Sequence, residues 1–180
     1  MRFVKQHIKV WMIIGVIFTI NTVVMSSCKV SYSFSGASIS PDIKTVSVLY
    51  FENRVQRGST VNPSLSQDFT EALRDKMKSQ TSLNLVEEDG DVQFEGEFTT
   101  YKIAPLAITG NQAAALNRFT VTVRVKFTNQ IDPKQDFDTS FSRYEDYPST
   151  QNFEDVEQDL LEKIIADLTE DVFNRAFVNW

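Results

Sequence analysis

N-R-F-T-V-T-V-R-V-K-F-T-N, residues 117–129, alternates between polar and apolar side chains from Arg118 to Thr128. The apolar side chains share one parity and are Phe119, Val121, Val123, Val125 and Phe127. The polar side chains share the other and include Arg118, Thr120, Thr122, Arg124, Lys126 and Thr128. Alternation with period two over this length, rich in β-branched residues, predicts a strand. Its two unlike faces predict a sheet that is covered on one side and open to solvent on the other.

Further strand patterns flank this segment. We expect strands at residues 43–51, 81–86, 92–103 and 135–144. Toward the end of the first segment, the side chains that point to either face of the sheet are nearly all apolar, which predicts an interior strand. The third places Glu95 and Glu97 on the polar face, and the last points Phe137 and Phe141 inward.

Two amphipathic helices complete the pattern. Asn62 and Pro63 suit the N-cap and the first turn of one helix, whose apolar stripe is Leu65, Phe69, Leu73 and Met77. The other begins at Asn152, and its stripe is Val156, Leu160, Ile164, Leu168 and Val172. Two helices with one stripe each suit one face of a single sheet. The predicted fold class is therefore α+β, a two-layer sandwich of one mostly antiparallel or mixed sheet with two helices on one face.

The N-terminus has the pattern of an export signal. Arg2, Lys5 and Lys9 precede an apolar run at residues 10–24, which is short for the roughly 20 residues of a spanning helix. Met25-Ser26-Ser27-Cys28 follows, and Cys28 is the only cysteine. The alternatives are a lipobox with lipidation at Cys28 and an ordinary signal with an incidental thiol. Because a lone cysteine cannot form an internal disulfide, we favour lipidation.

This interpretation divides the chain into three parts. We expect a lipoprotein signal at residues 1–27, a Ser-rich tether at 28–41 and a single domain at 42–180. No acidic cluster that might act as a surface-export tag follows Cys28, which favours the periplasmic face of an outer membrane. Lipid chains at Cys28 would hold the protein to that membrane.

Composition excludes several classes of function. The full chain holds 18 Lys and Arg against 24 Asp and Glu, and removal of the signal leaves 15 basic residues and a formal charge of −9. A body this acidic does not bind nucleic acid through its bulk field. The only histidine is His7, within the signal, so the mature chain lacks His- and Cys-based catalytic and metal sites. No cofactor is expected.

The carboxylates leave one enzymatic interpretation open. Glu95 and Glu97 could serve as a glycosidase pair, but side chains on an open sheet face lack a pocket wall, and we expect no enzyme. If strands 92–103 and 117–129 pair antiparallel, these carboxylates face Thr122, Arg124 or Lys126, and Lys126 neighbours Asp138. The result is either a charge-laced solubility face or a binding face. The connection at residues 104–116 is either an apolar lid or a partner contact.

Six segments carry a resemblance to a known family. They read M-S-S-C (25–28), Y-S-F-S-G-A-S-I-S-P-D-I-K-T-V-S-V (32–48), V-N-P-S-L-S-Q-D-F-T-E-A-L-R-D-K (61–76), G-D-V-Q-F-E-G-E-F-T (90–99), A-A-A-L-N-R-F-T-V-T-V-R-V-K-F-T-N (113–129) and F-N-R-A-F-V-N-W (173–180). In this order they resemble the LptE family of lipopolysaccharide-assembly lipoproteins over essentially the whole mature chain.

The resemblance implies a function without catalysis. It implies an outer-membrane lipoprotein that plugs the barrel of an LptD-type protein, helps to assemble it, and assists delivery of lipopolysaccharide to the outer leaflet. Basic residues of relatives are implicated in lipopolysaccharide contact, which makes Arg118, Arg124 and Lys126 the candidates here. The alternative is a generic periplasmic adaptor lipoprotein of another envelope or secretion complex.

Overall fold

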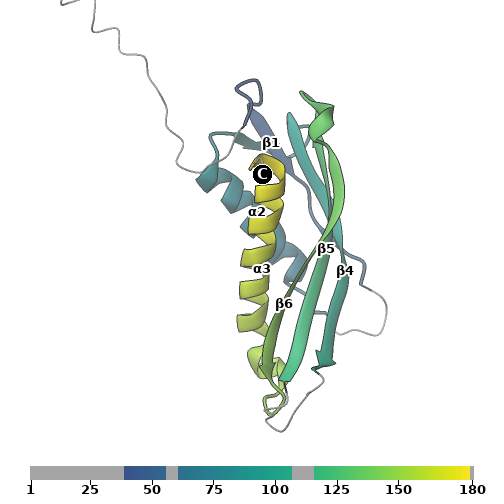
Figure 1. Ribbon diagram of the computed structural model, residues 1–180. Helices are drawn as coiled ribbons and strands as arrows, with labels where there is room; N and C mark the ends of the chain where they lie inside the picture. Colours follow the sequence, from purple (N-terminus) through teal and green to yellow (C-terminus); the bar gives the residue numbers. More distant parts are fainter. Residues whose placement is uncertain (1–38, 56–60, 107–115, 179–180) are drawn as a thin grey trace, which may run out of the picture. The chain divides into compact units, whose positions relative to one another are not determined.

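The computed structural model describes residues 39–55, 61–106 and 116–178, which belong to one unit of the chain (Figure 1). In chain order the elements are β1 (Thr45–Val48), β2 (Glu52–Asn53), α2 (Leu65–Gln80), β3 (Asn84–Val86), β4 (Val92–Pro105), β5 (Leu116–Asn129), the 3-10 helix η1 (Pro133–Gln135), β6 (Phe137–Pro148) and α3 (Phe153–Phe177). The predicted signal, with Cys28, and most of the predicted tether lie outside the described residues, as do residues 107–115 of the predicted long connection.

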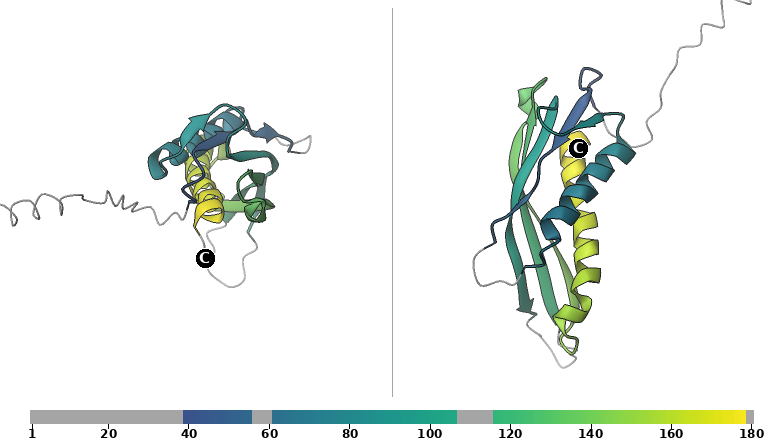
Figure 2. Two further views of the ribbon diagram at one scale, coloured as in Figure 1. Left: turned by 90° about the horizontal axis from the view of Figure 1, so that it is seen from above. Right: turned by 180° about the vertical axis from the view of Figure 1, so that it is seen from behind.

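The sheet is mixed, as predicted. Its order is β3-β1-β4-β5-β6, and β2 pairs with β4. Strand β1 is parallel to both of its neighbours, while β4, β5 and β6 form an antiparallel meander. Helices α2 and α3 lie together on one face of this sheet, and no helix or strand of the described residues covers the other face (Figure 2). The α+β two-layer prediction is therefore confirmed.

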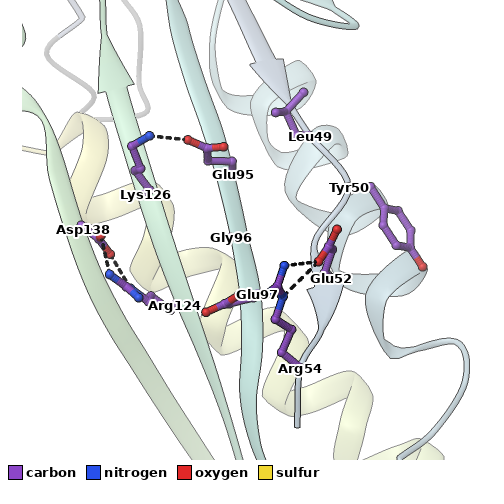
Figure 3. A pocket seen from close by; sticks show the side chains of 10 residues that line it. All are labelled: Leu49, Tyr50, Glu52, Arg54, Glu95, Gly96, Glu97, Arg124, Lys126 and Asp138. Carbon is purple, nitrogen blue, oxygen red and sulfur yellow. Dashed lines mark hydrogen bonds and ion pairs between the residues drawn. The ribbon is translucent and has the colours of Figure 1, made fainter.

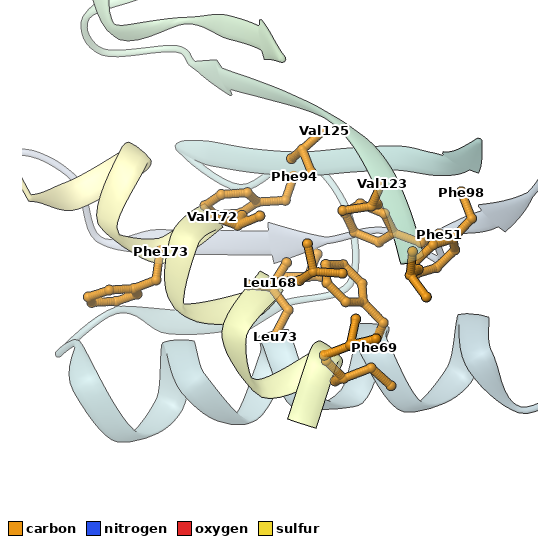
Figure 4. Packing of buried hydrophobic residues seen from close by; sticks show 14 of the residues in the cluster. Phe51, Phe69, Leu73, Phe94, Phe98, Val123, Val125, Leu168, Val172 and Phe173 are labelled. Carbon is orange, nitrogen blue, oxygen red and sulfur yellow. The ribbon is translucent and has the colours of Figure 1, made fainter. Parts of the chain in front are cut away.

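Strand β5 has the orientation that its alternation predicts. Phe119, Val121, Val123 and Val125 are fully buried, whereas Arg124 and Lys126 are exposed. The buried side packs against both helices, which contribute Phe69 and Leu73 from α2 and Leu168, Val172 and Phe173 from α3 (Figure 4). Both predicted helical stripes face this core, although Val156 is only partly buried.

The start of α2 differs from the expectation. The helix begins at Leu65 with Ser64 at the N-cap, two residues after the predicted cap Asn62. The side-chain oxygen of Asn62 accepts hydrogen bonds from the backbone N and the hydroxyl of Ser64, at 3.0 and 2.9 Å. Asn62 therefore forms a local turn that leads into the helix, which competes with capping. Helix α3 begins at Phe153, directly after the predicted Asn152.

The first predicted strand, residues 43–51, is interrupted. Val48 lies opposite Phe94, and Glu52 lies opposite Glu97. The chain therefore advances four residues between β1 and β2 while β4 advances three. The extra residue has the effect of a β-bulge, which re-aims side chains. Phe51 turns inward and is fully buried, while Tyr50 turns outward and is 59% exposed.

A second irregularity lies in β4. The register against β5 shifts between Phe98 and Thr100, so the simple alternation predicted for residues 92–103 holds only as far as Phe98. Beyond the shift, Tyr101 and Ile103 lie opposite Val121 and Phe119, on the helix-covered face. Tyr101 is buried there, and its hydroxyl donates a hydrogen bond to Glu157 of α3.

None of the helices in the described ranges has the length and apolar content needed to span a bilayer.

Candidate functional site on the open face of the sheet

We call the side of β4, β5 and β6 that the helices leave uncovered the open face. All three predicted contact residues lie on it. The exposed fractions of the side chains are 34% for Arg118, 54% for Arg124 and 57% for Lys126. Arg118 is six residues from Arg124, roughly 20 Å along an extended strand. The structure therefore brings Arg124 and Lys126 together and places Arg118 at the other end of the face.

The two arginines are held by aspartates of β6. Arg124 donates to both carboxylate oxygens of Asp138, with Nε–Oδ1 and Nη2–Oδ2 distances of 2.8 and 2.7 Å. Arg118 donates to both oxygens of Asp146 at 2.8 and 2.9 Å. This two-point geometry is the strong form of an arginine–carboxylate contact. Both guanidinium groups already have an anionic partner in the unbound protein.

Lys126 forms an ion pair with β4, on the side of β5 away from β6. Its Nζ lies 2.6 Å from Oε1 of Glu95 on β4. The predicted neighbours are confirmed, because Glu95 and Asp138 both lie directly opposite Lys126, and Glu97 lies opposite Arg124. Asp138, however, binds Arg124 diagonally and not Lys126.

These pairs shift the pKa values of their members in the expected directions. Hydrogen bonds from Arg124 lower the pKa of Asp138, and those from Arg118 lower the pKa of Asp146. The hydrogen bond to Glu95 raises the pKa of Lys126. Arg118, Arg124 and Lys126 are therefore each paired with an acidic side chain, so positive and negative side chains lie next to one another across the open face.

One end of the open face is hollowed (Figure 3). Arg124, Lys126 and their carboxylate partners form one wall, and Tyr50, Glu52 and Arg54 of the β1–β2 segment form the other. The hollow has a volume of about 490 Å³, within the roughly 300–1,000 Å³ of small-molecule sites. Such sites are mostly apolar, whereas this one is lined largely by ionised groups.

Arg54 joins the two walls of the hollow. Its guanidinium is 3.0 Å from the carboxylate of Glu52 and 3.2 Å from that of Glu97. The sequence analysis did not identify Arg54, Glu52 or Tyr50 as site residues. A polar loop was expected at residues 52–61, and Tyr50 falls in the strand predicted at residues 43–51. The sequence analysis also missed Asp146. The strand was predicted to end at Tyr144, but β6 continues to Pro148 and thereby places Asp146 opposite Arg118.

The helical side of the molecule carries the excess negative charge. Within α3 only Lys163 and Arg175 are basic, while eight residues are acidic: Glu154, Asp155, Glu157, Asp159, Glu162, Asp167, Glu170 and Asp171. The open face is nearly balanced by comparison. An anionic ligand is therefore repelled less by the open face than by α3.

The part of the chain that the structure describes contains no candidate metal site. No group of three or more His, Cys, Asp or Glu side chains in it is placed to hold a metal ion. The carboxylates of the hollow are instead engaged by Arg54, Arg124 and Lys126.

Comparisons with known proteins bear on the fold and on the family. Among solved structures, a hypothetical protein from Chlamydia trachomatis is 11% identical with a TM-score of 0.50, covering 76% of this chain and 99% of that one. The rare lipoprotein B from Shewanella oneidensis is 9% identical with a TM-score of 0.44, covering 72% and 89%. A minor lipoprotein from Acinetobacter baumannii is 12% identical with a TM-score of 0.44, covering 71% and 90%.

At 11% identity the Chlamydia structure supports the fold alone. The other two structures have TM-scores below 0.5 and support no conclusion about this chain. A search of curated proteins returned no match. The sequence profile of the LptE family, described as lipopolysaccharide-assembly, matches residues 43–176. That range runs from just before β1 almost to the end of α3, so it includes the helical layer and the whole open face. The chain belongs to the LptE family of lipopolysaccharide-assembly lipoproteins.

Proposed function

We propose that this protein is a non-enzymatic outer-membrane lipoprotein that sits in the lumen of an LptD-type barrel and helps to assemble it. In this role it assists delivery of lipopolysaccharide to the outer leaflet, and lipid chains on Cys28 anchor it. The observation that carries the proposal is the open face, on which Arg118, Arg124 and Lys126 are all paired with carboxylates. A polar surface without excess charge suits the polar interior of a wide membrane barrel.

Within this proposal Arg124 is the first contact residue for lipopolysaccharide or for the barrel, followed by Arg118 and Lys126. The guanidinium of Arg124 is half-exposed beside the hollow. Because Arg presents several donors in a planar fork, it can exchange its carboxylate partner for a phosphate with the same two-point geometry. Lys126 offers only a point charge.

Co-purification tests the proposal. A tagged full-length protein, extracted from native membranes, should bring down a large outer-membrane barrel. Arg124→Glu should reduce the yield of that barrel, or lipopolysaccharide binding, with little change in the thermal midpoint.

Arg143 offers a matched control for this variant. It also binds an aspartate at two points, with distances of 2.6 and 2.5 Å to Asp171 of α3, and its side chain is 45% exposed. It does not line the hollow. Arg143→Glu should therefore retain the barrel. Recovery of a different envelope complex with the wild-type protein would favour a periplasmic adaptor, and equal losses from both variants would contradict the assignment of Arg124.

A further inference from the structure

Tyr50 occupies an unusual position between two hollows. With Leu49 it lines the hollow on the open face and also a second hollow of about 500 Å³. The second hollow is bordered by Arg74 and Lys78 of α2, by β3, and by the two glutamates that follow β3, Glu87 and Glu88. Tyr50 therefore stands on the ridge between two polar depressions, and 59% of its surface is accessible.

The backbone on both sides of Tyr50 is fixed. The N–H of Leu49 donates to the carbonyl of Phe94 at 2.9 Å, and the N–H of Phe51 donates to the hydroxyl of Thr70 at 3.2 Å. The ring of Phe51 packs against Phe69 of α2, with centroids 4.9 Å apart. These contacts present the ring of Tyr50 to solvent in a defined place.

Gly96 makes the inward turn of Phe51 possible. A Cβ atom at this position would lie 2.6 Å from Cε1 of Phe51 and 2.1 Å from the carbonyl oxygen of Arg124. Only glycine leaves space for the Phe51 ring and the neighbouring strand. The sequence therefore provides both the extra residue that turns Tyr50 outward and the glycine that accommodates its neighbour.

The groups around Tyr50 favour a ligand rich in hydroxyls. Arg54 pairs with Glu52 and Glu97, and Arg124 pairs with Asp138, so the charges of these groups largely offset one another. A carboxylate and a guanidinium nonetheless retain further acceptor and donor positions after one pair has formed. Hydroxyl groups, which both donate and accept, can use these positions without displacing either partner. A phosphate would have to compete with the carboxylates.

The exposed ring supplies the remaining feature. Tyrosine combines a flat apolar surface with a polar tip, and the C–H groups on one side of a sugar ring can pack against such a surface. We propose that Tyr50 and the two hollows beside it form a saccharide-binding site, with the ring of Tyr50 as its platform. The assignment of the sugar to lipopolysaccharide rests on the proposed function, whereas recognition of a sugar does not.

The test uses full-length lipoprotein in a detergent without a sugar headgroup and measures saturation transfer to oligosaccharide protons. One probe is a lipopolysaccharide core oligosaccharide stripped of acyl chains and phosphates, and the other is maltoheptaose. The wild-type protein and Tyr50→Phe should bind with affinities within about threefold of each other. Tyr50→Ala should bind at least tenfold more weakly.

Tyr144 provides the control, because it is 52% exposed on the same sheet but has the guanidinium carbon of Arg118 3.5 Å from its ring centroid. Tyr144→Ala should bind as the wild type does. Binding of the core alone identifies lipopolysaccharide as the source, and binding of both probes indicates a general saccharide site.

Failure of both probes to bind the wild type, or unchanged affinity in Tyr50→Ala, would overturn the proposal. Barrel co-purification with the wild-type protein is measured separately. Failure of the proposed function would instead remove the barrel from the wild-type preparation, whatever the sugar result.

Discussion

Replacement of Phe119 by Ala tests the organisation of the sheet most directly. Phe119 is fully buried, and its ring meets Tyr101 and Phe153 edge-on, with centroid distances of 4.7 and 5.0 Å. A buried Phe→Ala change costs about 3–5 kcal/mol of unfolding free energy. Since a domain is stable by only about 5–15 kcal/mol, this loss is a large fraction of the total.

Thr122, three residues along the same strand, is the matched control. It lies on the open face, where its hydroxyl is 3.0 Å from that of Ser142. Water can replace this contact on an exposed surface, so Thr122→Ala should cost within roughly 0.5 kcal/mol.

Urea denaturation followed by circular dichroism separates the two outcomes. With a slope of about 2 kcal/mol per molar urea, Phe119→Ala should lower the midpoint by roughly 2 M and Thr122→Ala by at most about 0.3 M. The slope itself should stay the same. Similar shifts from both variants would mean that the two faces of β5 have been assigned wrongly.

The other predictions concern the anchor, the bulge and the ion pairs. Cys28→Ser should leave an uncleaved or soluble form that no longer fractionates with outer membrane, and failure of radiolabelled palmitate to enter the wild type would contradict the anchor. Gly96→Ala should destabilise the domain by about 1–3 kcal/mol or more, because the new methyl group overlaps backbone; an unchanged urea midpoint would refute this. The folded-state pKa values of Asp138 and Asp146 are lowered, so their stabilisation is present above the unfolded-state value near 3.8 and is lost as pH falls through the folded-state values. Asp138→Asn with Asp146→Asn should therefore flatten the fall in the urea midpoint between pH 5 and pH 2, and an equally steep fall would contradict it.

The sequence predicted the elements that repeat a simple pattern. Alternation in residues 117–129 determined which face of β5 is buried, because burial on one side acts on every second side chain. The stripes of both helices were recognised for the same reason, at a period of 3.6 residues. Antiparallel pairing of the two strands predicted that Glu95 and Glu97 face Thr122, Arg124 or Lys126, and the structure selects Lys126 and Arg124 among these.

The departures from pattern depend on contacts between distant residues. The inward turn of Phe51 requires space over Gly96 and a packing partner, Phe69, from α2. The shift at Phe98 brings Tyr101 to the buried side, where it reaches Glu157, more than fifty residues later in the chain. Neither contact leaves a local signal. For this reason the second wall of the hollow was not recognised: Arg54 was expected in a polar loop, and Tyr50 in the regular strand predicted at residues 43–51.

The distribution of charge connects these structural details with the proposed function. The chain is acidic as a whole, with a formal charge of −6, and if that charge were spread evenly every surface would repel lipopolysaccharide phosphates. Instead, α3 concentrates eight carboxylates against two cations, while the open face places Arg118, Arg124 and Lys126 opposite carboxylates. At physiological salt, exposed charges interact over about 8 Å. A ligand at the open face is therefore largely screened from the charge of α3 and responds mainly to local pairs. In the proposed function, contact is then governed by the exchange of hydrogen-bond partners in and beside the hollow, and the net charge of the chain has little influence on it.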